Sequence, residues 1–382
     1  MVEIEKYGWV NALRGYAILL VILIHTSEMF YSSSWMQIIT HTGDLGVQLF
    51  FIMSSFTLFN SYYKRKNVEL SHTKNDFFIR RFFRIAPFYY IAGLIYVCHT
   101  IFIKNENVNI IHLLSNYTFT NGLFLPAINY IPPGGWSVGV EMLFYLAIPW
   151  LCSHITSLKR SMLFLLFSIV ISNIINALLF YYVTYYTTSN WIGARQWSLY
   201  FWFPNQFPVF VFGIILYFVY KEIRVSEKTG NRLLILSLIS FLILAFVKFE
   251  LTYPEYFFQR EYVYSLLFTL FAIGVYSTRN SLIINSLIQK IGIVSFSMYL
   301  NHFIILAGML YCNEVILCEL KIRLNFPVEI LRNDFIFLVW YIIIVFTTFI
   351  FSKLTYKYIE FPGINLGKKV IMSLYPESKY EK

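Results

Sequence analysis

Ten long apolar runs divide this chain of 382 residues, and most of them are about as long as a bilayer is thick. A helix that crosses the hydrocarbon core needs about 20 mostly apolar residues. Because the runs are continuous rather than alternating, and because an open sheet edge leaves backbone groups unpaired in lipid, they predict helices rather than strands. The expected helices are 10–29, 45–63, 85–103, 137–152, 161–183, 201–220, 233–247, 262–275, 294–312 and 335–353.

The composition agrees with a membrane setting. Apolar residues make up 58% of the chain and charged residues only 13%, whereas soluble domains carry about 25% charged residues. A soluble globule of this size would leave much of its apolar surface in water, which excludes the soluble enzyme classes. The expected fold class is all-α, a polytopic transmembrane bundle of about ten helices.

The distribution of Lys and Arg predicts the orientation of these helices. With the N-terminus in the cytoplasm and ten crossings, 23 of the 30 Lys and Arg residues fall in cytoplasmic segments, as the positive-inside rule requires. Both termini are therefore expected in the cytoplasm. This orientation explains the net charge of +10 without a nucleic-acid partner, and some of the basic residues are expected to touch anionic membrane lipid.

The chain is expected to form one domain over residues 1–382. Its transmembrane core is predicted at about 9–362, followed by a short cytoplasmic tail, with no appended soluble domain. The first apolar run lacks the small-residue cleavage site of a signal peptide. Cys312 and Cys318 flank a predicted outer loop, and whether they pair is left open.

The first predicted helix contains three ionisable residues, which are costly inside a membrane and so need a reason. Arg14 precedes His25 by eleven residues, close to three helical turns, so the two share a face about 16 Å apart along the axis. Glu28 follows His25 at i+3 on the same face. A functional polar stripe is one interpretation; a snorkelling arginine and a histidine bonded to a neighbouring helix is the other.

A basic cluster enters the third predicted helix from the cytoplasm. Arg81 and Arg84 are i+3 neighbours, and Arg80 and Arg84 are i+4 neighbours. Two guanidinium groups on one face can clamp a phosphate or a carboxylate. The alternative is a simple positive-inside anchor.

Two further segments place polar groups in predicted helices. The segment Trp136-Ser-Val-Gly-Val-Glu141 begins the fourth helix. Glu141 either interacts favourably with the helix dipole near the N-terminus or faces a polar cavity. Tyr299-Leu-Asn-His302 lies in the ninth helix, where a lone histidine serves either packing or a site. No pair of histidines has metal-ligand spacing, so no metal site is predicted.

These segments, taken together and in order, resemble the acyltransferase-3 family of integral membrane O-acyltransferases, which modify bacterial surface glycans. Two departures stand in the second helix: Gln48 replaces the family's usual acid, and Ser54-Ser55 replaces its usual Ser-Gly. The first departure removes a possible charge partner there. The matching segments are Arg14 to His25, Gly46 to Phe51 with Ser54, Arg81 to Arg84, Trp136 to Glu141, Ser297 to His302 and Tyr358 to Pro362.

The resemblance implies a function and a location. The chain is expected to transfer an acyl group, most often acetyl, from acyl-CoA to a hydroxyl of a surface polysaccharide or of its lipid-linked precursor. Acetyl-CoA is then a donor substrate, no cofactor is permanently bound, and the site of action is the bacterial cytoplasmic (inner) membrane. The rival class is a transporter or flippase that moves a lipid-linked sugar or small anion without acyl chemistry.

The predicted residue roles follow from this chemistry. His25 is the expected general base for the acceptor hydroxyl, with its tautomer held by Glu28, which helix geometry favours, or by Glu141, which the resemblance favours. Arg81 and Arg84, assisted by Arg80 and Arg14, are expected to bind the phosphates of coenzyme A. Direct transfer and a covalent acyl-enzyme both stay open. The other expected substrate-binding residues are Trp136, Tyr299 and His302.

Overall fold

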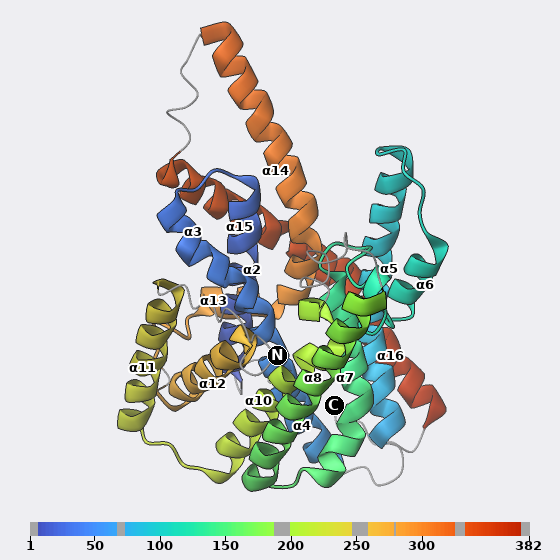
Figure 1. Ribbon diagram of the computed structural model, residues 1–382, viewed down its shortest axis with the longest axis vertical. Helices are drawn as coiled ribbons and strands as arrows, with labels where there is room; N and C mark the ends of the chain where they lie inside the picture. The colour runs from blue at the N-terminus through green and yellow to red at the C-terminus, as the bar shows by residue number, and fades with distance from the viewer. Residues whose placement is uncertain are drawn as a thin grey trace. The chain divides into compact units, whose positions relative to one another are not determined.

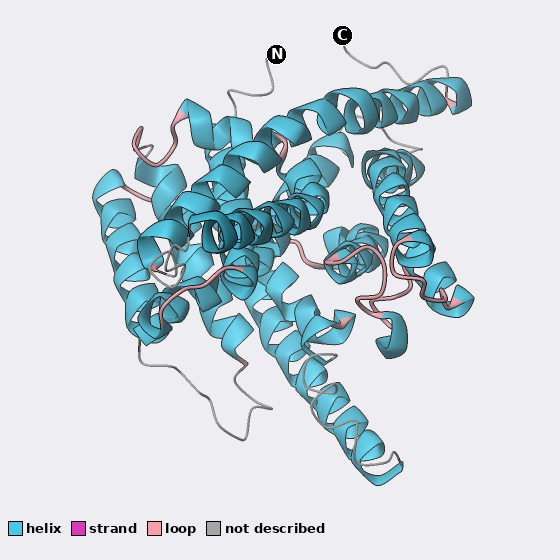
Figure 2. Cartoon of the chain, turned by 90° about the horizontal axis from the view of Figure 1, so that it is seen from above, coloured by secondary structure: helices cyan, strands magenta, loops and turns pink. Residues whose placement is uncertain are grey.

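The regular structure of the chain, taken from a computed structural model, is helical throughout the residues that the structure describes. These are residues 7–66, 73–186, 199–246, 259–278, 280–324 and 333–375. Figure 2 shows helices and loops, and no strand, in this part of the chain. The all-α class predicted from the apolar runs is therefore confirmed.

Figure 1 labels the longer helices along the chain. The shorter elements are α3 (Ser34–Thr40), η1 (His41–Leu45), α6 (Ile110–Tyr117), η2 (Leu125–Ala127), α13 (Ser286–Ile293), the π-helical turn η5 (Tyr356–Glu360) and α16 (Phe361–Leu374). The longer elements are α2 (Gly8–Met29), α4 (Gly46–Lys66), α5 (Thr73–Phe102), α7 (Gly135–His154), α8 (Leu158–Tyr186), α10 (Phe203–Glu222), α11 (Glu227–Phe246), α12 (Arg260–Thr278), α14 (Ser295–Leu324) and α15 (Asp334–Thr355).

Each of the ten predicted apolar runs coincides with one of these longer helices. Among the described residues, nine helical stretches are long and apolar enough to cross a membrane, and α12 is the predicted helix outside that set. The chain is thus a polytopic membrane protein. Helix α12 spans 19 residues, so its shortfall lies in apolarity, because its first turns carry Arg260 and Glu261.

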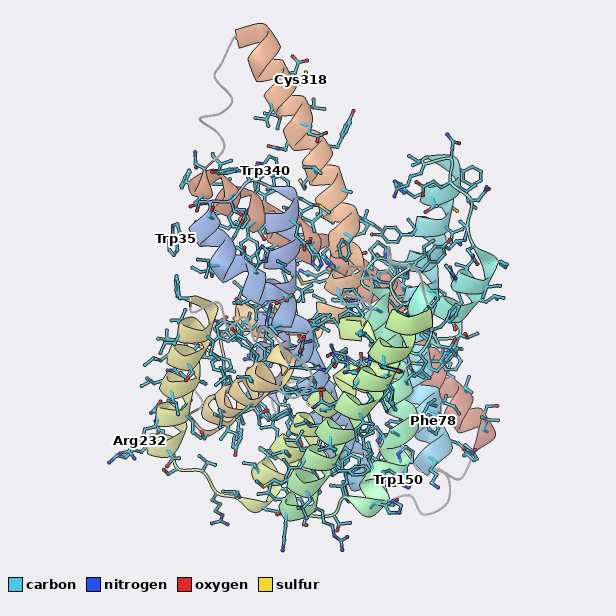
Figure 3. All side chains as sticks on the ribbon, viewed as in Figure 1. Trp35, Phe78, Trp150, Arg232, Cys318 and Trp340 are labelled. Atoms are coloured by element: carbon cyan, nitrogen blue, oxygen red, sulfur yellow. The ribbon has the colours of Figure 1, made fainter. Side chains whose placement is uncertain are left out.

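Two helices extend further than predicted. Helix α5 begins at Thr73, so the three arginines at 80, 81 and 84 lie inside it rather than ahead of it. Helix α14 continues to Leu324, so Cys312 and Cys318 lie on one helix and do not flank a loop. Both cysteines are free and exposed, and Figure 3 labels Cys318 on the C-terminal part of α14. Six residues of helix separate them by about 9 Å, too far for a disulfide.

The chain divides into two compact units. Unit one comprises Met1–Phe50, Ser226–Glu250 and Leu270–Tyr356. Unit two comprises Phe51–Val225, Leu251–Thr269 and Lys357–Lys382. Helices α4 and α12 each contribute residues to both units.

Unit one is built around α2, which packs against η1, α13, α14 and α15 (Figure 1). In lipid no hydrophobic force drives helices together, so close packing has to stabilise their association, and glycines let two helix backbones approach closely. A Cβ at Gly292 of α13 would lie 1.7 Å from the Asn11 carbonyl oxygen of α2. One at Gly43 of η1 would lie 2.3 Å from the Leu20 carbonyl oxygen. Backbone-to-backbone contact therefore determines how α2 is held.

Aromatic and polar contacts hold the outer elements of unit one. The Trp35 ring of α3 lies 6.3 Å from that of Phe246 at the end of α11, and the Trp340 ring of α15 lies 5.2 Å from Phe30; both tryptophans are labelled in Figure 3. The Tyr341 hydroxyl of α15 donates a hydrogen bond to the Leu19 carbonyl of α2 at 3.0 Å. These contacts fix α15 beside the half of α2 that carries His25.

Unit two brings α10 against α7 and α8, and α16 against α5. A buried amide chain joins α8 to the start of α10: the Trp202 indole donates to Asn176, which donates to Asn205, each at 2.9 Å. Gly213 of α10 lies against the backbone of α4, where a Cβ would meet the Ile52 carbonyl oxygen at 2.3 Å. Unit two thus places α4 and α7 in one packed group around α10.

Candidate functional site

The His25 side chain lies in the last turns of α2 and is half-buried. Its Nδ1 lies 2.8 Å from the Val21 carbonyl oxygen, one turn earlier on the same helix. A carbonyl oxygen only accepts, so in the neutral ring Nδ1 carries the proton and Nε2 carries the lone pair. Nε2 of His25 is therefore the nitrogen that can accept a proton.

A second imidazole packs against the first. His302 of α14 is completely buried, and its ring centroid lies 5.1 Å from that of His25. Its Nδ1 donates to the Tyr299 carbonyl at 2.6 Å, and its Nε2 has no hydrogen-bond partner within the described part of the chain. The Phe303 ring packs against both imidazoles, with its centroid 4.5 Å from that of His25 and 4.1 Å from that of His302. The two histidines share the same tautomer for the same reason.

The neighbours of His302 anchor it. The Asn301 amide donates to Ser352 Oγ at 3.0 Å and to Thr355 Oγ1 at 2.9 Å, which ties α14 to α15. Tyr299 is buried, and its ring lies edge-on to Phe50 at 6.3 Å. The segment singled out in the ninth predicted helix thus combines a site histidine with the contacts that hold it.

The carboxylate expected to hold the His25 tautomer is replaced by a backbone carbonyl. Val21 accepts the Nδ1 proton, and Glu28, although it shares the helix, is exposed. Sequence reasoning overlooked this because a helical carbonyl one turn back is always within reach and leaves no sequence signal. Arg14, three turns earlier on α2, is half-buried, as its place on the polar stripe requires.

Glu141 lies in the second turn of α7 and belongs to unit two. Its Oε1 accepts two hydroxyl protons, from Ser54 of α4 and from Tyr145 of α7, the latter at 2.6 Å. Tyr145 follows Glu141 at i+4, so the helix itself aligns that pair. Ser54 comes from a different helix and ties α4 to α7. Neither hydroxyl was predicted to be part of the site.

Arg81 of α5 adjoins the same cluster. Its guanidinium carbon lies 5.9 Å from the Tyr145 ring centroid and 5.7 Å from that of Phe77, and its Nη2 donates to Ser61 at 3.4 Å. Its Nε is buried and has no hydrogen-bond partner among the described residues. Tyr145 therefore contacts both the carboxylate of Glu141 and the cation of Arg81.

The other predicted binding residues of unit two are held differently. Arg80 forms an ion pair with the buried Asp76 at 3.8 Å, one turn back on α5. Arg84 is half-buried on the same helix. Trp136 is buried in an aromatic cluster, 4.7 Å from Phe201 between ring centroids, so its side chain already serves packing. The substrate roles assigned to these three residues stay predictions.

Among the described residues, no group of three or more His, Cys, Asp and Glu side chains is placed to hold a metal ion. The chemistry available within them is proton transfer at the two imidazoles of unit one, and hydroxyl, carboxylate and guanidinium chemistry in unit two. Phe303, Asn301, Ser54 and Tyr145 are the residues that sequence reasoning did not assign.

The comparisons with known proteins bear on the whole chain. A family model described as an acyltransferase domain matches residues 7–357. The match covers the histidine pair of unit one and the residues around Glu141 in unit two. Neither the comparison with curated proteins nor that with solved structures gave a match. With apolar helices that can cross a membrane several times and a family match over nearly its full length, the chain belongs to the acyltransferase-3 family and is a multi-pass membrane acyltransferase.

Proposed function

We propose that this acyltransferase moves an acetyl group from acetyl-CoA to a hydroxyl of a surface polysaccharide or of its lipid-linked precursor, in the bacterial cytoplasmic membrane. The observation that carries the proposal is the state of His25. An imidazole in the membrane-embedded part of the chain, with Nδ1 bound to a backbone carbonyl, has its basic Nε2 available. Acyl transfer to a hydroxyl needs such a base.

In the proposed reaction, His25 Nε2 takes the proton of the acceptor hydroxyl as its oxygen bonds to the acyl carbonyl carbon. The bond from that carbon to its carrier breaks, and the leaving group, the coenzyme A thiolate in direct transfer, takes the proton from His25. The Val21 carbonyl holds the imidazole orientation throughout, because Nδ1–H donates to it in the neutral and in the charged ring. His302 and Phe303 pack against the ring and restrict its rotation. General base catalysis of this kind contributes about 10²- to 10⁴-fold in rate.

Donor binding falls to the arginines. Coenzyme A is polyanionic, and guanidinium groups bind phosphate through paired donors. Arg81 supports this role because one of its donors is buried without a partner in the described part of the chain. Arg84 lies i+3 from it on α5, and Arg14 on α2 is the further predicted contributor. Arg80 is the least suited of the four, since it pairs with Asp76.

The acceptor is proposed by chemical class. A surface glycan, or its lipid-linked precursor, supplies sugar hydroxyls at the membrane. The excess of Lys and Arg in the predicted cytoplasmic segments supports a donor side in the cytoplasm with both termini there. The family match favours acyl chemistry over transport of a lipid-linked sugar without reaction.

Mass analysis of surface polysaccharide from cells with and without the protein tests the proposal. We expect a gain of one acetyl mass per repeat unit when the protein is present. Membranes given labelled acetyl-CoA should transfer label to the glycan, and membranes carrying His25→Asn should not. A glycan of unchanged mass, together with no label transfer by wild-type membranes, would overturn the proposed donor and acceptor.

A further inference from the structure

Ser54 of α4 and Glu141 of α7 form a hydrogen-bonded pair in the helical core of unit two. The Ser54 hydroxyl donates to Glu141 Oε1, and the serine is 6% exposed. Tyr145 donates to the same oxygen at 2.6 Å. A hydroxyl nucleophile, a base within hydrogen-bond reach and a third group that orients the base are the parts of an activated serine.

The adjacent serine shows that the pairing is specific to one position. Ser55 is also buried, and its Oγ has no hydrogen-bond partner within the described residues. Its Cβ packs toward α10, where a Cβ built on Gly213 would lie 2.7 Å from it. Ser55 thus serves helix packing, while Ser54 alone reaches the carboxylate. The two serines form a natural pair for comparison.

A positive charge adjoins the pair. The guanidinium of Arg81 lies against the Tyr145 ring, and its buried Nε–H is unpaired in the described structure. A buried donor of a charged group is costly to leave without an acceptor, and a ligand can supply one. In the proposed function a phosphate oxygen of coenzyme A supplies that acceptor, so the acyl donor binds in the same unit as Ser54.

We propose that Ser54 carries the acyl group as an oxygen ester between donor and acceptor. In the first half-reaction, Ser54 passes its proton to Glu141, and its Oγ bonds to the thioester carbonyl carbon. The carbon–sulfur bond breaks, and the thiolate takes the proton from Glu141 and leaves as coenzyme A. In the second, the acceptor oxygen gives its proton to a base and bonds to the carbonyl carbon. The Ser54–acyl bond then breaks and the proton returns to Ser54.

This relay rests on the proposed function, which supplies the acetyl-CoA donor and the hydroxyl acceptor. It deepens that function in one respect. A covalent intermediate separates the acyl-CoA step from the glycan step, so the two substrates do not have to be bound at once.

The test is to trap the intermediate. Purified full-length protein is mixed with radiolabelled acetyl-CoA in the absence of glycan, quenched in acid, and separated on a denaturing gel. Wild type and Ser55→Ala should retain label, and Ser54→Ala should retain less than a tenth of it. Ser54→Cys should retain label that neutral hydroxylamine removes, because a thioester is far more labile to it than the wild-type oxygen ester.

Each outcome decides between the relay and its alternatives. Label mapped by peptide mass to Ser54 supports the relay. Unlabelled wild type that still acetylates glycan, or Ser54→Ala that transfers acetyl within about twofold of wild type, overturns the relay and leaves the proposed function intact. Reduced turnover of Ser54→Ala with an unlabelled wild type makes Ser54 a positioning residue and likewise overturns the relay.

Wild type that acetylates no glycan counts against the proposed function, and trapped label on Ser54 would still support the relay. Size-exclusion profiles of all variants identify misfolded protein. If Ser54→Ala is misfolded, the hydroxylamine-sensitive label on Ser54→Cys tests the relay in its place.

Discussion

The His302 ring lies 5.1 Å from the His25 ring, centroid to centroid, and is completely buried beside it. Both rings donate Nδ1–H to a carbonyl of their own helix, Val21 for one and Tyr299 for the other. Both therefore leave Nε2 as a base in their neutral forms. In each ring Nδ1 is the donor that holds the side chain and Nε2 is the basic nitrogen. A substitution that keeps the donor and removes the base therefore tests the two functions of each histidine separately.

Replacement of His25 by asparagine should abolish acyl transfer. The asparagine amide can still donate near the position of Nδ1, but it offers no basic nitrogen at the position of Nε2. We expect a fall of about 10²- to 10⁴-fold in kcat, measured with labelled acetyl-CoA and glycan. His99→Asn, an exposed position near the end of α5, is the matched control. Activity of His25→Asn above a tenth of wild type would remove His25 as the base.

Replacement of His302 by asparagine should lower kcat and leave the KM for acetyl-CoA unchanged. Asparagine keeps a donor for the Tyr299 carbonyl, while the loss of the rest of the ring opens space beside His25. We expect a drop of about tenfold in kcat, which corresponds to about 1.4 kcal/mol. An increase in KM with kcat preserved would instead support the substrate-binding role that the sequence suggested for His302.

Lysine at position 81 should weaken donor binding. The Arg81 guanidinium lies against two aromatic rings and donates to Ser61, and a lysine ammonium reproduces neither the planar stacking nor the forked donors. We expect the KM for acetyl-CoA to rise about tenfold or more, since a charged hydrogen bond is worth about 1.5–3 kcal/mol. Arg160→Lys, at an exposed site bonded to Thr156, should leave it unchanged. Equal effects in both variants would contradict the assignment.

Alanine at Gly292 should destabilise unit one. Its Cβ would lie 1.7 Å from the Asn11 carbonyl oxygen, so α13 and α2 would have to separate. We expect the unfolding temperature in detergent to fall by several degrees. Gly308→Ala is the control, because nothing lies within 4 Å of the added carbon and alanine favours a helix interior by about 1 kcal/mol. Loss of stability in the control alone would refute the packing argument.

Much of the helical frame was predictable because hydropathy is a local property. Each of the ten runs became a helix, although the ends of α5 and α14 were misplaced by more than two turns. Polar or charged residues at those ends continue the helix beyond the apolar run, as Thr73 to Arg84 do in α5. Apolarity predicts where a helix meets lipid, and it does not predict where the helix stops.

The site was predictable in part. His25, His302, Glu141 and Arg81 stood out because ionisable groups in apolar helices are rare and costly, and Tyr145 was detectable in principle at i+4 from Glu141. Ser54 stood out from Ser55 only through its place in the family segment, because hydropathy and polarity do not separate two adjacent serines. Only one of the two faces α7, which depends on how α4 is rotated when it packs.

By itself, the sequence determined that this protein is an all-helical membrane protein with costly polar groups in its spans, and its ordered motifs pointed to acyl transfer. Those properties follow from the number of apolar residues in a row and from backbone groups that must be satisfied in lipid. The tertiary structure decided which polar groups meet: His25 with a backbone carbonyl instead of Glu28, His302 with His25, and Glu141 with Ser54 and Tyr145. Two of these four contacts, His302 with His25 and Ser54 with Glu141, join helices distant in the chain. Helix rotation and glycine-mediated contact, which no single segment encodes, bring them together.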